Sequence, residues 1–241
     1  MQGITDIHTH ILFGVDDGAA DEAESAFLLK QAYELGERRI VLTPHYRDGM
    51  FEADADDIRR RFQRMKEMAL EISADLKLYL GREIYIPLTG QTNLEHVNLF
   101  EPRLILIEFS PQVHFDVMRN EIEDVLQKGF TVIIAHLERY ALISAEQVAF
   151  LRKIGCYIQV NATDATAISL FDKRKSVKKR AHKLLDQKLV DFIASDVHHQ
   201  DIRPNRMQES YRFIRKKYGE GRAEELFTYN ANCLLNEMYG A

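Results

Sequence analysis

The sequence predicts an α/β fold in which a mainly parallel sheet closes into a (β/α) barrel within a single domain, residues 1–241. Short apolar runs recur along the chain and are mostly continuous rather than alternating, as expected of parallel strands buried on both faces. Longer amphipathic stretches of helical length separate these runs. The first strand is not followed by a glycine-rich dinucleotide-binding loop, which favours a barrel over an open doubly wound sheet. The open sheet remains the alternative.

The strands are expected where Ile, Val, Leu, Phe and Tyr concentrate, and the helices where polar and apolar positions follow a helical period. The expected strands cover residues 4–8, 39–45, 76–84, 103–109, 130–136, 156–162 and 190–198. The expected helices cover residues 21–35, 54–73, 116–128, 145–154, 174–188, 207–217 and 222–238. Asp21 with Glu24 forms the cap pattern of the first helix, and Gly36 can end it. Gly129 and Gly155 stand where two further helices should end.

Composition and charge limit the setting and the partners of the protein. The net charge of −5 and the pI near 6.0 argue against nucleic acid as the main partner. No apolar run approaches the length of a membrane span, and the N-terminus lacks a signal-peptide pattern. The two cysteines, Cys156 and Cys233, do not form a disulfide scaffold. A reducing, cytoplasmic setting is expected.

The stretch DIHTH places two histidines at the end of the first expected strand. Because side chains two apart on a strand point to the same face, His8 and His10 can converge on one object. A metal ion is the commonest object that requires two neutral imidazoles. Two solvated histidines at a polar strand end are the simpler interpretation, so the rest of the chain has to decide.

Further metal-competent side chains stand at the ends of other expected strands. Parallel strands end on one side of a sheet, where barrel active sites form, so these side chains should meet there. The candidate metal ligands are His8, His10, Asp17, His45, Glu83, Glu108, His136, Asp196 and His198. The other histidines, His96, His114, His182 and His199, do not follow this pattern.

This set of donors is too large for one ion and suits two or three. Without a thiolate among them, the donors favour Mn, Fe, Zn or Mg over soft metals. Three divalent ions would outweigh the four carboxylates by two positive charges, and a bridging hydroxide would lower the excess to one. Such a site favours an anionic substrate, with phosphate the obvious candidate.

Two arginines lie in loops on the same side of the expected sheet. Arg139 follows His136 closely, and Arg203 follows His198. A guanidinium in such a loop can hold phosphate oxygens in a fork, although pairing with a nearby carboxylate is the simpler interpretation. A thiolate nucleophile is excluded, because Ala162 and Tyr239 stand where a cysteine-dependent phosphatase would carry its arginine.

The ordered motifs D-I-H-x-H, V-D-D-G, T-P-H, G-x-E, I-E-F, A-H-x-E-R and S-D-x-H resemble those of the PHP (polymerase and histidinol phosphatase) superfamily. The closer resemblance is to its bacterial protein-tyrosine phosphatases of capsular and exopolysaccharide operons. This resemblance implies a distorted seven-stranded (β/α) barrel with a trinuclear, typically manganese-dependent site at the C-terminal ends of the strands. It also implies hydrolysis of phosphotyrosine on a membrane-associated tyrosine autokinase.

The family's ligands fall on the nine candidate residues named above, and its phosphate-binding arginines fall on Arg139 and Arg203. Two positions depart from the family pattern. Leu137 replaces the usual proline, which frees the loop backbone and leaves the aim of Arg139 open, and His199 replaces a frequent asparagine. The basic stretch DKRKSVKKR, residues 172–180, is interpreted as a solvated helix face, with docking of an acidic segment or anionic membrane as the alternative.

The mechanism expected from these residues is in-line attack on phosphorus by a metal-bridging hydroxide, with the metals and both arginines stabilising the equatorial oxygens. Asp196 can orient the hydroxide as well as bind metal, and His45 or His198 can serve if a general acid is used. Three alternatives remain. They are a small-molecule phosphatase acting on histidinol phosphate or a nucleotide phosphate, a non-catalytic metal-binding domain, and an amide or ring hydrolase. The first needs a closing lid, and no long insertion between the expected strands offers one.

Overall fold

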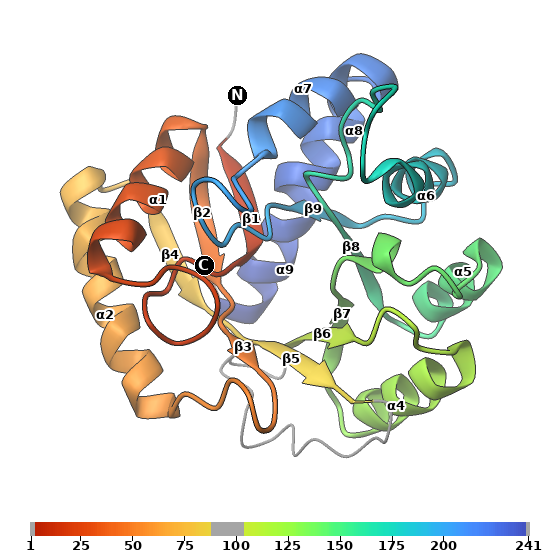
Figure 1. Cartoon of the computed structure of the whole chain (residues 1–241), viewed down its shortest axis with the longest axis horizontal. Helices are drawn as coiled ribbons and strands as arrows, with labels where there is room; N and C mark the ends of the chain where they lie inside the picture. The colour runs from red at the N-terminus through yellow and green to blue at the C-terminus, as the bar shows by residue number, and fades with distance from the viewer. Residues whose placement is uncertain (1–2, 88–103, 240–241) are drawn as a thin grey trace.

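The computed structural model describes residues 3–87 and 104–239, and its strands form two parallel sheets (Figure 1). One sheet has the strand order β1 (Ile4–Thr9), β2 (Glu37–Leu42), β4 (Lys77–Leu80). The other has the order β3 (His45–Tyr46), β5 (Glu83–Ile86), β6 (Leu104–Phe109), β7 (Thr131–Ile134), β8 (Tyr157–Asn161), β9 (Phe192–Ala194). All of these pairings are parallel, as the continuous apolar runs predict.

The two sheets meet where β1 lies beside the chain that leaves β9. The backbone N–H of Asp196 donates to the carbonyl of His8, and that of His10 donates to the carbonyl of Val197, both at 2.9 Å. These hydrogen bonds continue the parallel ladder from one sheet to the other, so the strands form one curled parallel surface. The C-terminal ends of the strands consequently lie on one side of it.

Two of the expected strands are each divided into two shorter strands. The run 39–45 becomes β2 and β3, which belong to different sheets, and the run 76–84 becomes β4 and β5. Pro44 lies at the first break, and because proline has no N–H it cannot donate to a ladder there. Gly81 lies at the second break, and its N–H donates to the carbonyl of Leu42 at 2.8 Å. The two segments, β2–β3 and β4–β5, therefore pass from one sheet to the other side by side.

The helices follow the expected order, with boundaries that differ by one or two residues. They are α1 (Glu22–Glu34), α2 (Ala55–Ile72), α4 (Phe115–Gln127), α5 (Ala145–Lys153), α6 (Lys175–Asp186) and α7 (Met207–Tyr218). The last expected helix, 222–238, is instead α8 (Glu220–Glu224), a π-helical turn η2 (Glu225–Tyr229) and α9 (Asn230–Tyr239). Asp21 caps α1 as predicted, accepting a hydrogen bond from the backbone of Glu24 at 2.9 Å.

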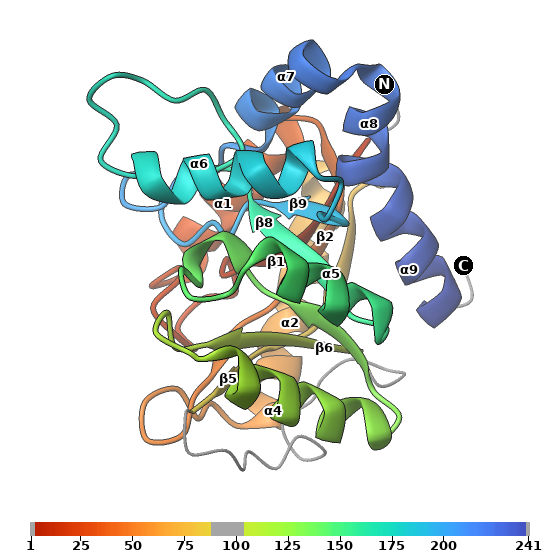
Figure 2. The same ribbon diagram turned by 90° about the vertical axis from the view of Figure 1, so that its right-hand side faces the viewer.

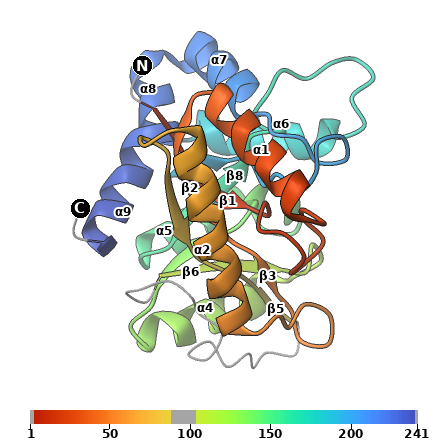
Figure 3. The ribbon, with the colours of Figure 1, turned by 90° about the vertical axis from the view of Figure 1, so that its left-hand side faces the viewer.

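The helices cover the outside of the curled sheet and one of its ends. α1 and α2 pack on the three-stranded sheet through apolar side chains such as Leu29, Ile58 and Ile40. α4, α5, α6 and α7 cover the six-stranded sheet (Figure 2). α9 packs Leu234 and Leu235 against apolar residues of β1, β2, β6, β7 and β9. Figures 2 and 3 show α9 on the side opposite the long loop before α6. That loop side is where the C-terminal ends of the strands lie.

Among the described residues, no helix combines the length and the apolar character needed to cross a membrane. The longest helix, α2, spans Ala55–Ile72 and carries many charged residues.

Candidate metal centre

Glu83, at the start of β5, lies at the centre of the predicted site. Its Oε2 is 3.0 Å from Nε2 of His8 and 3.1 Å from Nε2 of His10. The same oxygen is 3.1 Å from Nδ1 of His45, and Oε1 is 3.0 Å from Nε2 of His136. Four imidazoles from β1, β3 and the end of β7 therefore surround one fully buried carboxylate. Side chains from separate strands thus meet as the sequence predicts, although His45 and Glu83 begin the short strands β3 and β5 and do not end strands as expected.

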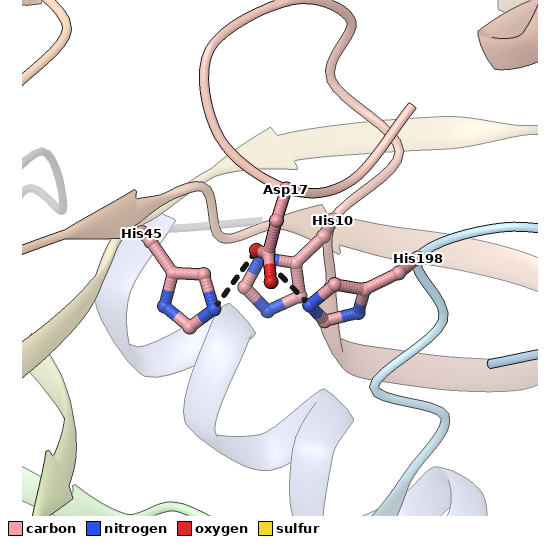
Figure 4. A group of neighbouring side chains, drawn as sticks. All are labelled: His10, Asp17, His45 and His198. Atoms are coloured by element: carbon pink, nitrogen blue, oxygen red, sulfur yellow. Dashed lines mark ion pairs between the residues drawn. The ribbon is translucent and has the colours of Figure 1, made fainter. Parts of the chain in front are cut away.

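Asp17 approaches this cluster from the loop after β1 (Figure 4). Its Oδ1 lies 3.5 Å from Nε2 of His45 and 3.5 Å from Nε2 of His198. Together with His10, these residues form a group whose donor atoms all lie within 4.8 Å of one another. Asp17 is half exposed, so this group lies at the solvent edge of the cluster.

The two carboxylate oxygens of Asp196 have different surroundings. Oδ2 accepts hydrogen bonds from Arg139 at 2.6 Å, from Arg203 at 2.5 Å and from the amide of Asn161 at 2.6 Å. Oδ1 is buried, has no hydrogen-bond partner, and lies 3.5 Å from Nε2 of His8. Both predicted arginines are thus held at the edge of the cluster, and one oxygen is left facing its interior.

Glu108 completes the set from the end of β6. Its Oε1 lies 3.4 Å from Nε2 of His136, and with Glu83 and His45 it forms another group of closely spaced donors. Burial and the neighbouring charge of Glu83 raise the pKa of Glu108 to about 8. Burial and the guanidinium of Arg139 lower the pKa of His136 to about 4. His136 is consequently neutral at pH 7, the state in which an imidazole can bind metal.

Hydrogen bonds outside the cluster orient three of its imidazoles. Nδ1 of His10 contacts Asp16 at 2.8 Å, and Nδ1 of His8 contacts the amide oxygen of Gln159 at 3.3 Å. Nδ1 of His198 contacts the backbone carbonyl of Asp196 at 3.0 Å. Because each of these partners is an oxygen acceptor, Nδ1 can donate to it, and Nε2 is then the atom that can bind a metal once it has lost its proton. In His8 and His10, Nε2 faces the interior of the cluster.

The residues present fit divalent metal ions. The donor set consists of imidazole nitrogens and carboxylate oxygens, which suits Mn, Fe, Zn or Mg. The interior-facing Oδ1 of Asp196 has no hydrogen-bond partner, which is costly for a buried oxygen unless a cation satisfies it. Burial alone would lower the pKa of His10, but hydrogen bonds to Asp16 and Glu83 outweigh burial and raise that pKa to about 10. The cluster therefore attracts positive charge.

Asp16 is a residue that the sequence pattern did not select. Its Oδ2 accepts from Nδ1 of His10 and from the backbone of His45, both at 2.8 Å, and its Oδ1 accepts from the backbone of Gly18 at 2.9 Å. The neighbouring Asp17 points into the cluster instead. The two adjacent aspartates in GVDDG were a signal for a second functional carboxylate. The sequence does not show which aspartate points into the cluster and which one supports a histidine from outside.

Replacing Asp16 with asparagine should weaken metal binding by about 10- to 100-fold, because an uncharged amide holds the imidazole of His10 less firmly. Calorimetric titration of metal-free protein with Mn²⁺ measures this effect. Asp201→Asn, at an exposed aspartate in the loop that follows β9, is the matched control. Equal affinities of the D16N and D201N proteins would contradict a positioning role for Asp16.

Gly18 is required by a close approach between two backbone segments. A Cβ atom at this position would lie 1.9 Å from the carbonyl oxygen of His10. That carbonyl also accepts from the backbone of Ala19 at 3.0 Å, so it cannot move away without cost. The last glycine of the GVDDG motif therefore lets the loop fold back on β1 and place Asp16 and Asp17.

Gly18→Ala should destabilise the protein by about 1–3 kcal/mol, because the added methyl group overlaps backbone atoms. Unfolding in denaturant measures the change. Gly221→Ala is the control, since a Cβ at Gly221 in α8 meets nothing within 4 Å. That substitution should leave stability unchanged or raise it slightly. A G18A protein as stable as the wild type would show that the loop can shift to make room.

Two of the cluster residues have left-handed backbone conformations that are uncommon for non-glycine residues. His136 has φ 33° and Asp196 has φ 54°. The N–H of His136 donates to the Gln159 side chain at 2.6 Å, which helps to hold this conformation. Leu137, in place of the family's proline, is fully buried in the core and begins the short helix η1 (Leu137–Arg139). Arg139 remains directed at Asp196.

The histidines outside the strand-end pattern have separate environments. His199 contacts Glu24 at 2.9 Å and the backbone carbonyl of Asp17 at 3.0 Å, so it supports the Asp17 loop. His182 contacts a backbone carbonyl in the loop before α6, and His114 precedes α4. His96 lies outside the described residues, as does most of the segment between β5 and β6, on which the expectation of no long lid partly rests.

Comparisons with known proteins agree with this chemistry. The family model for capsular polysaccharide synthesis, CpsB/CapC, matches residues 4–236. The tyrosine-protein phosphatase CpsB of Streptococcus pneumoniae is 40% identical over 239 residues, covering 97% of this chain and 98% of that protein. The tyrosine-protein phosphatase YwqE of Bacillus subtilis is 28% identical over 237 residues, covering 97% of this chain and 92% of that protein.

Solved structures are similar at two levels. A structure from the pair YwqE of Bacillus subtilis and CpsB of Streptococcus pneumoniae, metal-dependent tyrosine phosphatases, matches with a TM-score of 0.82 and 27% identity. It covers 97% of this chain and 95% of that chain. The lactonase Lmo2620 of Listeria monocytogenes matches with a TM-score of 0.61 and 12% identity, and the match covers 95% of this chain and 93% of that chain. At this identity the match shows a similar fold only.

Proposed function

The chain belongs to the CpsB/CapC family of capsular polysaccharide synthesis, and from this premise we propose that it is a metal-dependent protein-tyrosine phosphatase acting as a single domain. The observation that carries the proposal is the meeting of imidazoles and carboxylates from separate strand ends around the buried Glu83. The name of the full-length relative at 40% identity supplies the reaction class, a phosphoric monoester hydrolysis.

We propose that this cluster holds three divalent ions, most suitably manganese. The proposed ligands are His8, His10, Asp17, His45, Glu83, Glu108, His136, Asp196 and His198, and the closely spaced groups among them support more than one ion. Bound divalent ions act as Lewis acids and lower the pKa of water toward neutrality. Glu83, each of whose oxygens lies close to imidazole nitrogens, would help to hold these ions.

In the proposed fold, the nine strand segments of residues 3–87 and 104–239 correspond to seven strands of a distorted (β/α) barrel, with the metal site at their C-terminal ends. β2 continues into β3 and β4 into β5, which accounts for the difference in number. The backbone link between β1 and the chain after β9 supports the closure.

The catalytic functions proposed for the protein's own residues are phosphate binding and orientation. Arg139 and Arg203 flank Asp196 and can each present remaining N–H groups to phosphate oxygens. Asp196 and His198 would orient the attacking water in addition to binding metal. Since a phenolate leaving group has a conjugate-acid pKa of about 10, strong general-acid assistance is less necessary for phosphotyrosine than for phosphoserine.

The proposed partner is a phosphotyrosine-bearing segment of a membrane-associated bacterial tyrosine kinase. The family's link to capsular polysaccharide synthesis supports this partner. We further propose a cytoplasmic location. Cys156 and Cys233 are both free thiols, as expected in a reducing compartment.

Hydrolysis of a phosphotyrosine peptide, measured beside histidinol phosphate with Mn²⁺ and again after chelation, tests the proposal. We expect turnover of the peptide to be preferred and to be lost on chelation. Preference for histidinol phosphate would retain the site and overturn the substrate class. No turnover of either compound, with metal bound, would overturn the phosphatase function.

A further inference from the structure

A small cavity of about 160 Å³ lies beside Asp196, between the ends of β8 and β9 and the two loops that follow them. Four arginines line it: Arg139, Arg174, Arg203 and Arg206. The long loop before α6 ends at Arg174. In Figure 2 this loop projects on the side of the molecule opposite α9. The cavity is therefore an extension of the candidate metal centre and not a separate hollow.

The proposed reaction uses only two of these four arginines. Arg139 and Arg203 both donate to Asp196 and can bind the phosphate that is hydrolysed. Arg174 lies further away along the cavity wall, where it forms a two-pronged ion pair with the buried Asp164 at 2.8 and 2.5 Å. Such a pair fixes the position of the Arg174 guanidinium and leaves part of its N–H edge available.

Arg206 is held much more loosely than the other three arginines. Arg206 forms an ion pair with Glu209, three residues later, at 2.9 Å, and both side chains are about half exposed. Exposed pairs of this kind contribute little to stability, so an incoming anion can replace Glu209 at little cost. Arg206 is thus free to turn toward a ligand in the cavity.

The cavity is lined by more guanidinium groups than the two proposed to bind the phosphate. The buried carboxylates of Asp164 and Asp196 pair with three of the four arginines, and Glu209 pairs with the fourth, Arg206, at the solvent edge. Once a phosphate is held by Arg139 and Arg203, Arg174 and Arg206 still present positive charge. The limited volume suits one side-chain carboxylate, and the polar side chains of Asn161 and Thr163 on the same wall add hydrogen-bonding groups.

We propose that this cavity is a second anion-binding subsite, which receives an acidic side chain next to the phosphotyrosine in the peptide substrate. This inference rests on the proposed phosphatase function and deepens it by naming a feature of the substrate. Ile202, on the cavity wall and 78% exposed, offers apolar contact to the same peptide. Arg206 is the residue that determines this preference, and Arg174 fixes the other side of the subsite.

The test compares matched phosphotyrosine peptides that carry Glu or Gln at each of the two positions on either side of the phosphotyrosine. We expect one position at which Glu raises kcat/KM about fivefold over Gln, mainly through KM, as for an exposed charge pair worth about 1 kcal/mol. The same peptides with a non-hydrolysable phosphonate analogue of phosphotyrosine give dissociation constants, which should show the same ratio without turnover.

Three variants separate the subsite from general charge effects. R206E should remove the preference for Glu and favour a Lys-bearing peptide. Glu209→Gln should increase the preference, because Arg206 loses its competing partner. R212E makes the same change in charge at an exposed position further along α7 and should leave the preference unaltered.

Equal values for the Glu and Gln peptides at every position, with good turnover of both, would overturn the subsite and leave the phosphatase function intact. An R212E protein that loses the preference as much as R206E would also overturn it, because the effect would then come from net charge. Failure of every peptide to be hydrolysed or bound would overturn the proposed function, and the subsite with it.

Discussion

Replacing Glu83 with glutamine should abolish phosphotyrosine hydrolysis and remove most of the bound metal. The two oxygens of this buried carboxylate lie within 3.1 Å of four imidazole nitrogens. Glutamine keeps the shape, but it removes the negative charge and turns N–H donors toward the interior, where lone pairs should face a cation. Since loss of a merely supporting residue costs about 10- to 100-fold, loss of this central group should cost at least about 100-fold.

The Glu83→Gln experiment measures both the metal content of the purified protein and its rate of peptide hydrolysis. Elemental analysis after gel filtration reports the Mn²⁺ retained per chain, and kcat/KM is measured with the phosphotyrosine peptide. Glu71→Gln, a change of the same chemistry on the exposed surface of α2, is the control and should leave both quantities unchanged. An E83Q protein that keeps its metal and remains within tenfold of wild-type activity would remove Glu83 from the proposed centre.

Replacing Arg139 with alanine should lower kcat/KM for the phosphotyrosine peptide by about 10²–10³, the usual cost of losing one donor to a developing anion. Metal content should remain near that of the wild type, because Oδ2 of Asp196 keeps Arg203 and Asn161 as partners. Arg139→Lys retains the charge without the planar fork and should fall between the alanine variant and the wild type.

Inhibition by inorganic phosphate gives a separate measure of the Arg139 contact. The inhibition constant should rise in the R139A protein and be unchanged in Arg152→Ala. Arg152 also forms an ion pair at 2.6 Å, but with Asp191 away from the metal centre. If phosphate inhibited the R139A and wild-type proteins equally, Arg139 would have a structural function at Asp196 only.

Local signals explain why most of the helices could be predicted. Asp21 caps α1 through a side-chain hydrogen bond, and such a cap needs only the residues next to it. The end of the chain was harder, because the expected helix 222–238 contains a π-helical turn at Glu225–Tyr229. The apolar pattern of α8 and α9 continues through this turn, so periodicity alone does not reveal the change in hydrogen bonding.

Long-range packing explains what could not be predicted about the strands. The run 39–45 was expected to form one strand around the apolar residues 40–42, yet it divides at Pro44 and continues in another sheet. A proline near the end of such a run is compatible with a strand end or with a division. The choice between them depends on which strands lie alongside, and those come from distant parts of the sequence.

The same distinction applies to the site. The clustering of the candidate ligands could be predicted because the end of a parallel strand fixes which side of the sheet its residues reach, although His45 and Glu83 lie at the starts of short strands. Asp16, Gln159 and Asn161 were not predicted, although they contact His10, His8 and Asp196 respectively. Gln159 and Asn161 alternate along β8 and share a face, which was a usable signal, but amides at the end of a strand have many other functions.

The left-handed backbone at His136 and Asp196 makes this chain a poor candidate for improvement by screening for heat tolerance alone. Each such residue costs roughly 1–3 kcal/mol when it is not glycine. A screen that rewards only resistance to unfolding would favour relief of this cost, and the residues it would replace are those that carry the donor atoms. Selection on turnover would instead preserve a less stable fold, so for these two positions durability and activity are opposing objectives.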